Sequence, residues 1–138
     1  MAIGISTATQ NAMCAAAVGR MDAGAGPGTI QIRTGTRPVD PNAAASGTLL
    51  ATFTCNDPAF GTPSAGAAAI SNSPQLTTTG VAAGDAGHFR ALDSTGAVVM
   101  VGSVSDTGGS GDLKLNTITV SVGVSVAMDS GSITQPAG

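Results

Sequence analysis

The chain of 138 residues has one histidine, His88, the residue type that most often supplies acid–base chemistry near neutral pH. A nucleophile needs a base beside it, and no G-x-S-x-G motif accompanies His88 to provide the nucleophile. His88 opens a stretch with strand periodicity after a glycine-containing loop. We therefore predict that it is a solvent-facing residue at a strand edge, in preference to a catalytic base or a metal ligand.

The acidic residues are all aspartates, and nearly all of them lie next to Gly, Ser, Pro or Asn, which is typical of turns. A glycosidase would need two of these carboxylates close together and aromatic platforms for its sugar, but the chain has no Trp or Tyr. The segment SDTGGSGD (105–112) lacks the alternating ligands and the closing Glu of an EF-hand calcium loop. The eight aspartates are Asp22, Asp40, Asp57, Asp85, Asp93, Asp106, Asp112 and Asp129.

Two cysteines and two glycine-rich segments are the remaining motifs that could carry chemistry. Cys14 and Cys55 have no second pair to complete a zinc site, so we interpret both as small buried apolar residues. GAGPG (24–28) precedes a predicted strand instead of opening a helix, and neither it nor GGSG (108–111) carries the G-K-[ST] of a phosphate loop. We predict that both segments are loops.

Arg33 and Arg37 flank a Thr-Gly-Thr turn, and two interpretations of them stay open. They could pair with an acidic patch on a partner, or they could form the solvated edge of a loop. The chain has only five Lys and Arg residues in all and no aromatic residues between them, which argues against nucleic acid as a partner.

Charged residues make up only 9% of the chain, against about 25% in an average soluble domain. The surface must then be rich in Ser, Thr, Gly and Ala, which lose little solvation or conformational entropy on association with other proteins. No run of about 18 apolar residues is present for a membrane span. The first ten residues, MAIGISTATQ, lack the pattern of a secretory signal, so we expect synthesis and folding in a cytoplasm.

The length predicts a single domain (1–138) with a thin core. Apolar residues form 42% of the chain, but 24 of them are Ala, and Leu, Ile, Val and Phe together number 27. The net charge of −3 is low enough for this composition to favour folding over disorder.

Residues 6–22 are predicted to form one helix that packs against a sheet. Ser6 and Thr7 offer an N-cap, and Gly24 is a natural C-terminal cap. The apolar positions recur at helical spacing, at Cys14, Ala17, Val18 and Met21.

From residue 29 the periodicity changes to two, which predicts strands. The segment 118–128 should place Val120, Val122, Val124, Val126 and Met128 on one face, with a bend at Gly123 that splits it. Seven to nine short strands predict an antiparallel β-sandwich or jelly roll over about 29–136. The predicted strands are 29–34, 49–55, 67–71, 75–79, 88–93 and 97–104 joined by a turn at 93–96, 113–117, 118–128, and 132–134 ending at Pro136.

Four segments together resemble a group of small virion proteins of tailed bacteriophages. They are STATQNAM to GRMDAGAGPGTIQIRTGTRP, GTLLATFTCNDPAFG, HFRALDSTGAVVMVGSV and GDLKLNTITVSVGVSVAMDSGSITQPAG. The chain resembles in particular the head decoration or cement proteins, such as the jelly-roll cement proteins of Bordetella-infecting podoviruses. It departs from their pattern in the helix, where Cys14-Ala15-Ala16-Ala17 stands in place of larger aliphatic and acidic residues.

The resemblance implies a structural protein without catalytic residues, and the residues themselves predict no metal and no cofactor. Its expected partners are the major capsid protein of an HK97-like icosahedral shell and a second copy of itself, with no nucleic acid and no membrane. It would lie on the capsid exterior and clamp neighbouring capsomers, after synthesis in the cytoplasm of the host bacterium. The alternatives are a tail or spike component, or a carbohydrate-binding adhesive module. The sequence identifies no contact residues for any of these.

Overall fold

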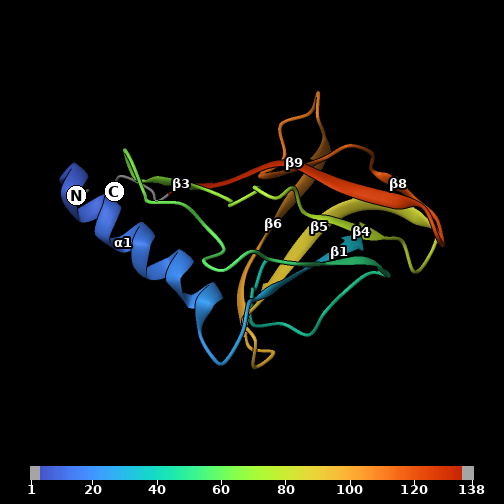
Figure 1. Ribbon diagram of the computed structural model, residues 1–138, viewed down its shortest axis with the longest axis horizontal. Helices are drawn as coiled ribbons and strands as arrows, with labels where there is room; N and C mark the ends of the chain where they lie inside the picture. The colour runs from blue at the N-terminus through green and yellow to red at the C-terminus, as the bar shows by residue number, and fades with distance from the viewer. Residues whose placement is uncertain (1–3, 135–138) are drawn as a thin grey trace.

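A computed structural model describes residues 4–134 and shows a mainly β protein with one N-terminal α-helix (Figure 1). The prediction of a mainly β fold with a helix preceding the sheet is confirmed. Helix α1 (Thr7–Gly19) continues into a 3₁₀ turn, η1 (Arg20–Asp22). The strands are β1 (Thr29–Thr34), β2 (Leu49–Thr54), β3 (Ala67–Ala69), β4 (Thr77–Thr79), β5 (Gly84–Leu92), β6 (Val98–Asp106), β7 (Leu113–Leu115), β8 (Thr119–Val120) and β9 (Ser125–Thr134).

The nine strands form one curled sheet in the order β2-β1-β5-β6-β7-β9-β3, with β4 on β9 and β8 on β5. The curl brings β2, at one end of the sheet, next to β4, near the other end. The Val81 N–H, just after β4, donates to the Leu50 carbonyl of β2 at 2.7 Å. The architecture belongs to the β-sandwich or jelly-roll-like class. One pairing differs from the all-antiparallel prediction: β6 and β7 run parallel, because the loop 107–112 returns the chain to the same end before β7 begins.

The core lies inside the curl and is organised around the central strands β1, β5 and β6. Cross-strand pairing places Phe89 of β5 opposite Ile32 of β1 and Gly102 of β6. Residues opposite one another on neighbouring strands share a face, so this row points into the core. Phe89 is 3% exposed, and a Cβ at Gly102 would lie 2.5 Å from its ring. The ring therefore fills the space that a side chain at position 102 would take.

The hairpin predicted between 88 and 104 is present, with a turn over 93–96. The Gly96 N–H donates to the Asp93 carbonyl and the Asp93 N–H to the Ala97 carbonyl, both at 3.0 Å. Strand β5 begins four residues earlier than predicted, at Gly84, because its first residues pair with β8.

The helix has the predicted N-cap but not the predicted C-terminal cap. The Ser6 hydroxyl accepts from the Thr9 N–H at 3.2 Å, and Cys14, Val18 and Met21 are buried as expected. The α-helix ends at Gly19 and tightens into η1, so Gly24 lies in the following turn. Gly24 has a φ of +92° and packs against the side chain of Ser94 at the β5–β6 turn, which leaves no room for a Cβ.

The prediction of one continuous apolar face over 118–128 is wrong at two positions. The bend at Gly123, with a φ of +82°, separates β8 from β9 as predicted. It also turns Val122 and Val124 out of the core, where they are 73% and 41% exposed, whereas Val120 and Val126 stay buried. The segment predicted as a separate strand at 132–134 is the end of β9, and Pro136 lies outside the described residues.

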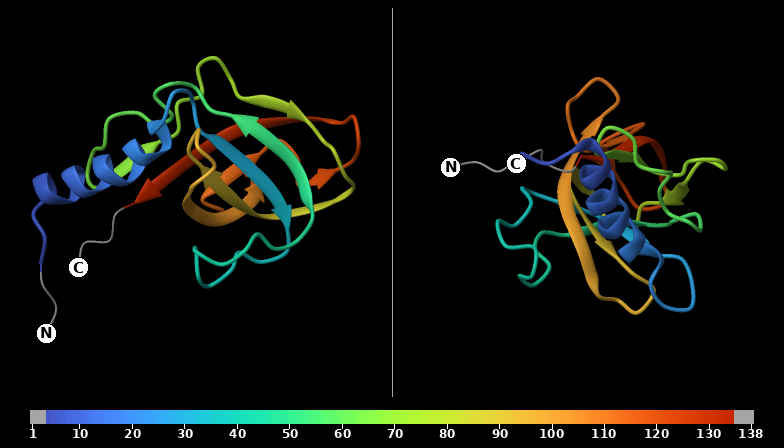
Figure 2. Two further views of the ribbon diagram at one scale, coloured as in Figure 1. Left: turned by 90° about the horizontal axis from the view of Figure 1, so that it is seen from below. Right: turned by 90° about the vertical axis from the view of Figure 1, so that its left-hand side faces the viewer.

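Helix α1, β3 and the end of β9 form an extension beside the curled sheet (Figures 1 and 2). The Asn11 side-chain oxygen accepts from the Gly66 N–H at 2.8 Å just before β3. On the same side of the helix, the Cys14 thiol approaches the Ile133 carbonyl of β9 at 3.9 Å. These contacts attach the helix, which at 13 residues is too short to be stable alone in water, to the two strands.

Replacing Gly102 by Ala should destabilise the protein by about 1 to 3 kcal/mol, because the new methyl group overlaps the Phe89 ring in a packed core. Urea unfolding measures the change. Gly19→Ala at the end of α1 is the matched control, since a Cβ there meets nothing within 4 Å, and it should leave stability unchanged or slightly higher. A Gly102→Ala variant as stable as the wild type would show that the ring is free to move away.

Candidate functional site

His88 is buried at 1% exposure in a central strand, so the prediction of a solvent-facing edge residue is wrong. Its strand β5 is paired on both sides, with β1 and with β6. The imidazole Nδ1 lies 3.0 Å from the Gly35 carbonyl and donates a hydrogen bond to it. The loop after β1 therefore covers the ring and holds it in a structural role.

Two arginines attach the same loop to the outer face of the sheet. Arg33 donates to the Gly47 carbonyl at 3.3 Å and to the Gln31 side chain at 3.1 Å, and Arg90 donates to the Ala43 carbonyl at 3.0 Å. Of the two arginines singled out by sequence, Arg33 is thus bound within the protein, whereas Arg37 is exposed in the loop. The two do not form one basic site.

Two of the eight aspartates, Asp40 and Asp93, accept from backbone N–H groups two to four residues further along the chain, as is typical of turns. Asp93 is the clearest case, at 6% exposure in the β5–β6 turn. The Thr95 hydroxyl, 2.6 Å from its carboxylate, contributes most to lowering the pKa of Asp93. The N–H groups of Ala97 and Thr95 and the charge of Arg20 lower this pKa further, against the opposing effect of burial.

Because the folded-state pKa of Asp93 is lowered, its ionised form stabilises the fold above the unfolded pKa of about 3.9, and this contribution is lost as the pH falls through the folded pKa. Asp93→Asn should therefore lose more stability relative to the wild type at about pH 6 than at about pH 2. Urea unfolding at both pH values checks this. Thr95→Val removes the main hydrogen-bond donor but keeps the carboxylate. Its loss of stability should also be greater at about pH 6 than at about pH 2, but by less than for Asp93→Asn. An equal loss for Asp93→Asn at both pH values would contradict the assignment.

The segment 105–112 does not gather the ligands of a calcium loop. Asp112 uses one carboxylate oxygen to accept from the N–H and hydroxyl of Ser103, at 3.1 and 3.2 Å. Asp106 is exposed, and its carbonyl accepts from the Gly109 N–H in the loop. Within residues 4–134, no group of three His, Cys, Asp or Glu side chains is placed to hold a metal ion.

Both cysteines are buried and free, as predicted. Cys14 lies on the buried face of α1, and Cys55 follows β2 in the core. Burial, with the nearby negative charge of Asp22, raises the pKa of Cys55 to about 11. A thiol with such a pKa is almost entirely protonated near neutral pH, which makes it a poor nucleophile.

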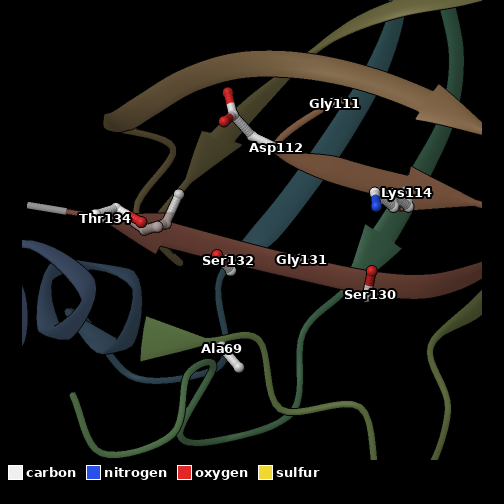
Figure 3. Close-up of a pocket in the computed structure, with 9 residues that line it drawn as sticks. Ala69, Gly111, Asp112, Lys114, Ser130, Gly131, Ser132 and Thr134 are labelled. Carbon is white, nitrogen blue, oxygen red and sulfur yellow. The ribbon is translucent and has the colours of Figure 1, made fainter. Parts of the chain in front are cut away.

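An open groove of about 540 Å³ lies on the outer face of β7, β9 and β3, and we call it the outer groove (Figure 3). Small residues form its floor, and Lys114 and Asp112 are its charged side chains. The hydroxyls of Ser130, Ser132 and Thr134 lie along β9, because alternate residues of a strand share a face. The groove offers hydrogen-bonding groups but no nucleophile–base pair.

Three exposed valines lie together beside the turn between β8 and β9, and we call them the valine surface: Val81, Val122 and Val124. The two segments that carry them are joined by hydrogen bonds, from the Gly80 N–H to the Val124 carbonyl at 2.8 Å and from the Gly123 N–H to the Gly80 carbonyl at 3.0 Å. Val81 is 61% exposed. In the sequence, this surface is indicated by Gly123, which interrupts the regular alternation of valines with polar or small residues over 118–128.

The exposed side of α1 is the second uncharged surface, which we call the helix surface. It consists of small side chains and one methionine, Met13, which is 40% exposed. Helix α1 and the β8–β9 turn lie at opposite ends of the long axis of the molecule (Figure 1). The members of the helix surface are Ala8, Ala12, Met13, Ala15 and Ala16.

Comparison of the chain with family models, with curated proteins and with solved structures finds no match. Among the described residues, no helix has both the length and the apolar character needed to cross a membrane.

Proposed function

We propose that this protein is a structural virion component, a cement protein that binds the outside of an icosahedral phage capsid and joins neighbouring capsomers. The observation that carries the proposal is the pair of uncharged surfaces at opposite ends of the molecule, the valine surface and the helix surface. A clamp needs two separate contacts, one for each subunit that it joins. The resemblance of the sequence to decoration proteins supports the same role.

The chemistry of the two surfaces suits permanent contact with protein. Burying a valine fully contributes about 1.5 kcal/mol or more, and small side chains lose little rotamer entropy when they are covered. Once one end is bound, the second end faces its own partner at high effective concentration. Modest contacts at each end therefore add up to firm attachment over many copies.

The proposal is tested by co-sedimentation of the purified protein with capsid shells that lack it. We expect the wild type to pellet with the shells in a saturable manner. The double variant Val81→Ser/Val122→Ser should bind about tenfold more weakly or worse, since it removes two apolar contacts from one end.

Val39→Ser is the matched control, because Val39 is 96% exposed in the loop after β1 and is not part of the valine surface. It should bind shells as the wild type does. A wild-type protein that stays in the supernatant at every concentration would exclude the cement function. Wild-type binding by the double variant would exclude the valine surface as a contact.

The number of copies in each particle distinguishes a cement protein from a tail or spike component. A cement protein is present at every capsomer, whereas a tail component is present in a few copies at one vertex. Quantitative mass spectrometry of purified particles gives the copy number relative to the major capsid protein.

The outer groove favours a second candidate function, binding of a carbohydrate. Its serine and threonine hydroxyls, with Lys114 and Asp112, match the polar groups of a sugar. However, the chain has no Trp or Tyr, and its three Phe residues are buried, so no aromatic ring is available to stack on a sugar face. Binding on a glycan array that Lys114→Ala abolishes would support this function over the cement function.

A further inference from the structure

Strand β6 has one open edge. It pairs with β5 along most of its length, but on its other side it pairs with β7 only over 104–106. Among the described residues, no strand pairs with that edge over 98–103. The edge ends at Ser103, whose N–H donates to the Asp112 carboxylate just before β7 begins. Since peptide groups alternate in direction along a strand, the N–H and carbonyl of Val101 point to the open edge as those of Ser103 do.

An apolar groove of about 260 Å³, the edge groove, follows this open edge. Four consecutive apolar residues, Val98–Val101, form one wall, and all four are half-buried. Ala17 of α1 and Ile133 of β9 lie across from them, and Phe89 also contributes to the lining. Natural sheets protect open edges with Lys, Pro or a covering segment. Val98–Val101 contains neither Lys nor Pro, and although a register shift against β5 falls at Val98–Met100, the open edge is free to accept a strand of another chain.

The two charged residues of the edge groove lie toward opposite ends of the open edge. Asp112 contacts Ser103 at one end. Arg20 lies near Asp93, in the turn before β6, and so marks the Val98 end. Both Arg20 and Asp112 are exposed.

We propose that a second copy of this chain binds at the edge groove, with the two β6 strands paired antiparallel about a two-fold axis near the middle of Val98–Val101. Antiparallel pairing reverses one strand against the other, so Arg20 of each copy faces Asp112 of its partner. The arrangement thereby forms two equivalent ion pairs and covers the apolar wall of both copies. A partner with one sign of charge would satisfy only one end of the groove. This proposal rests on the self-association included in the proposed function and identifies its face.

Sedimentation equilibrium tests the proposal. The wild type should have twice the mass of the 13.2 kDa chain at micromolar concentrations. Val101→Lys should give a single chain, because it places a charge beside the open edge without entering the core. Arg20→Glu and Asp112→Lys should each weaken association at least tenfold. The double variant Arg20→Glu/Asp112→Lys restores opposite charges across the two-fold axis, so it should recover most of the lost affinity.

Arg37→Glu is the matched control for charge reversal, since Arg37 is exposed in the loop after β1, and it should associate as the wild type does. Circular dichroism shows whether Val101→Lys keeps its fold, and the charge-reversal series tests the proposal even if it does not. A single-chain wild type, or a double variant no better than its single parents, would overturn the proposal. A single-chain protein that still binds shells and loses binding with Val101→Lys would assign the edge to a shell strand instead. A dimer that does not bind shells would keep this proposal and remove the cement function.

Discussion

The contact between the Phe89 ring and the backbone of Gly102 determines how the central strands fit together. The ring is one of only three phenylalanine rings, and all three are buried. The ring leaves no room for a side chain at position 102. The pairing of Phe89 with Gly102 therefore sets the register of β5 and β6. That register places the Asp93 turn at one end of the hairpin and the open edge of β6 along its side. Apart from Phe53 and Phe60, the core is made of smaller aliphatic, alanine, cysteine and methionine side chains, so few other side chains of this size are present.

The outer face of β1 and β5 is closed by polar contacts instead of a second apolar layer. Arg33, His88 and Arg90 all donate to backbone carbonyls of the loop between β1 and β2. Each side chain donates a hydrogen bond to this loop and so helps to order it. Two of the five basic residues, Arg33 and Arg90, are therefore bound within the fold. This contributes to the uncharged character of the two ends of the molecule.

Local patterns predicted much of the fold, and long-range contacts account for most of the errors. Strand β1 and the β5–β6 hairpin were predictable because alternation and turn chemistry are properties of neighbouring residues. His88 was misplaced because its cover, the carbonyl of Gly35, comes from a distant loop that no local pattern reveals. The prediction for Val122 and Val124 was wrong because an alternating pattern does not show that the turn at Gly123 points these side chains outward. The valine surface was not predictable from spacing, since it depends on which segments the curl brings together.

Both cysteines are free and buried, so neither thiol is accessible to a reagent while the fold is closed. They also lie in different layers: Cys14 faces β9 under the helix, and Cys55 lies in the core beside Asp22. A thiol reagent reaches each cysteine only when the packing around it opens. Modification of Cys14 therefore reports opening of the contact between α1 and β9, and modification of Cys55 reports opening of the core beside β2 and Asp22.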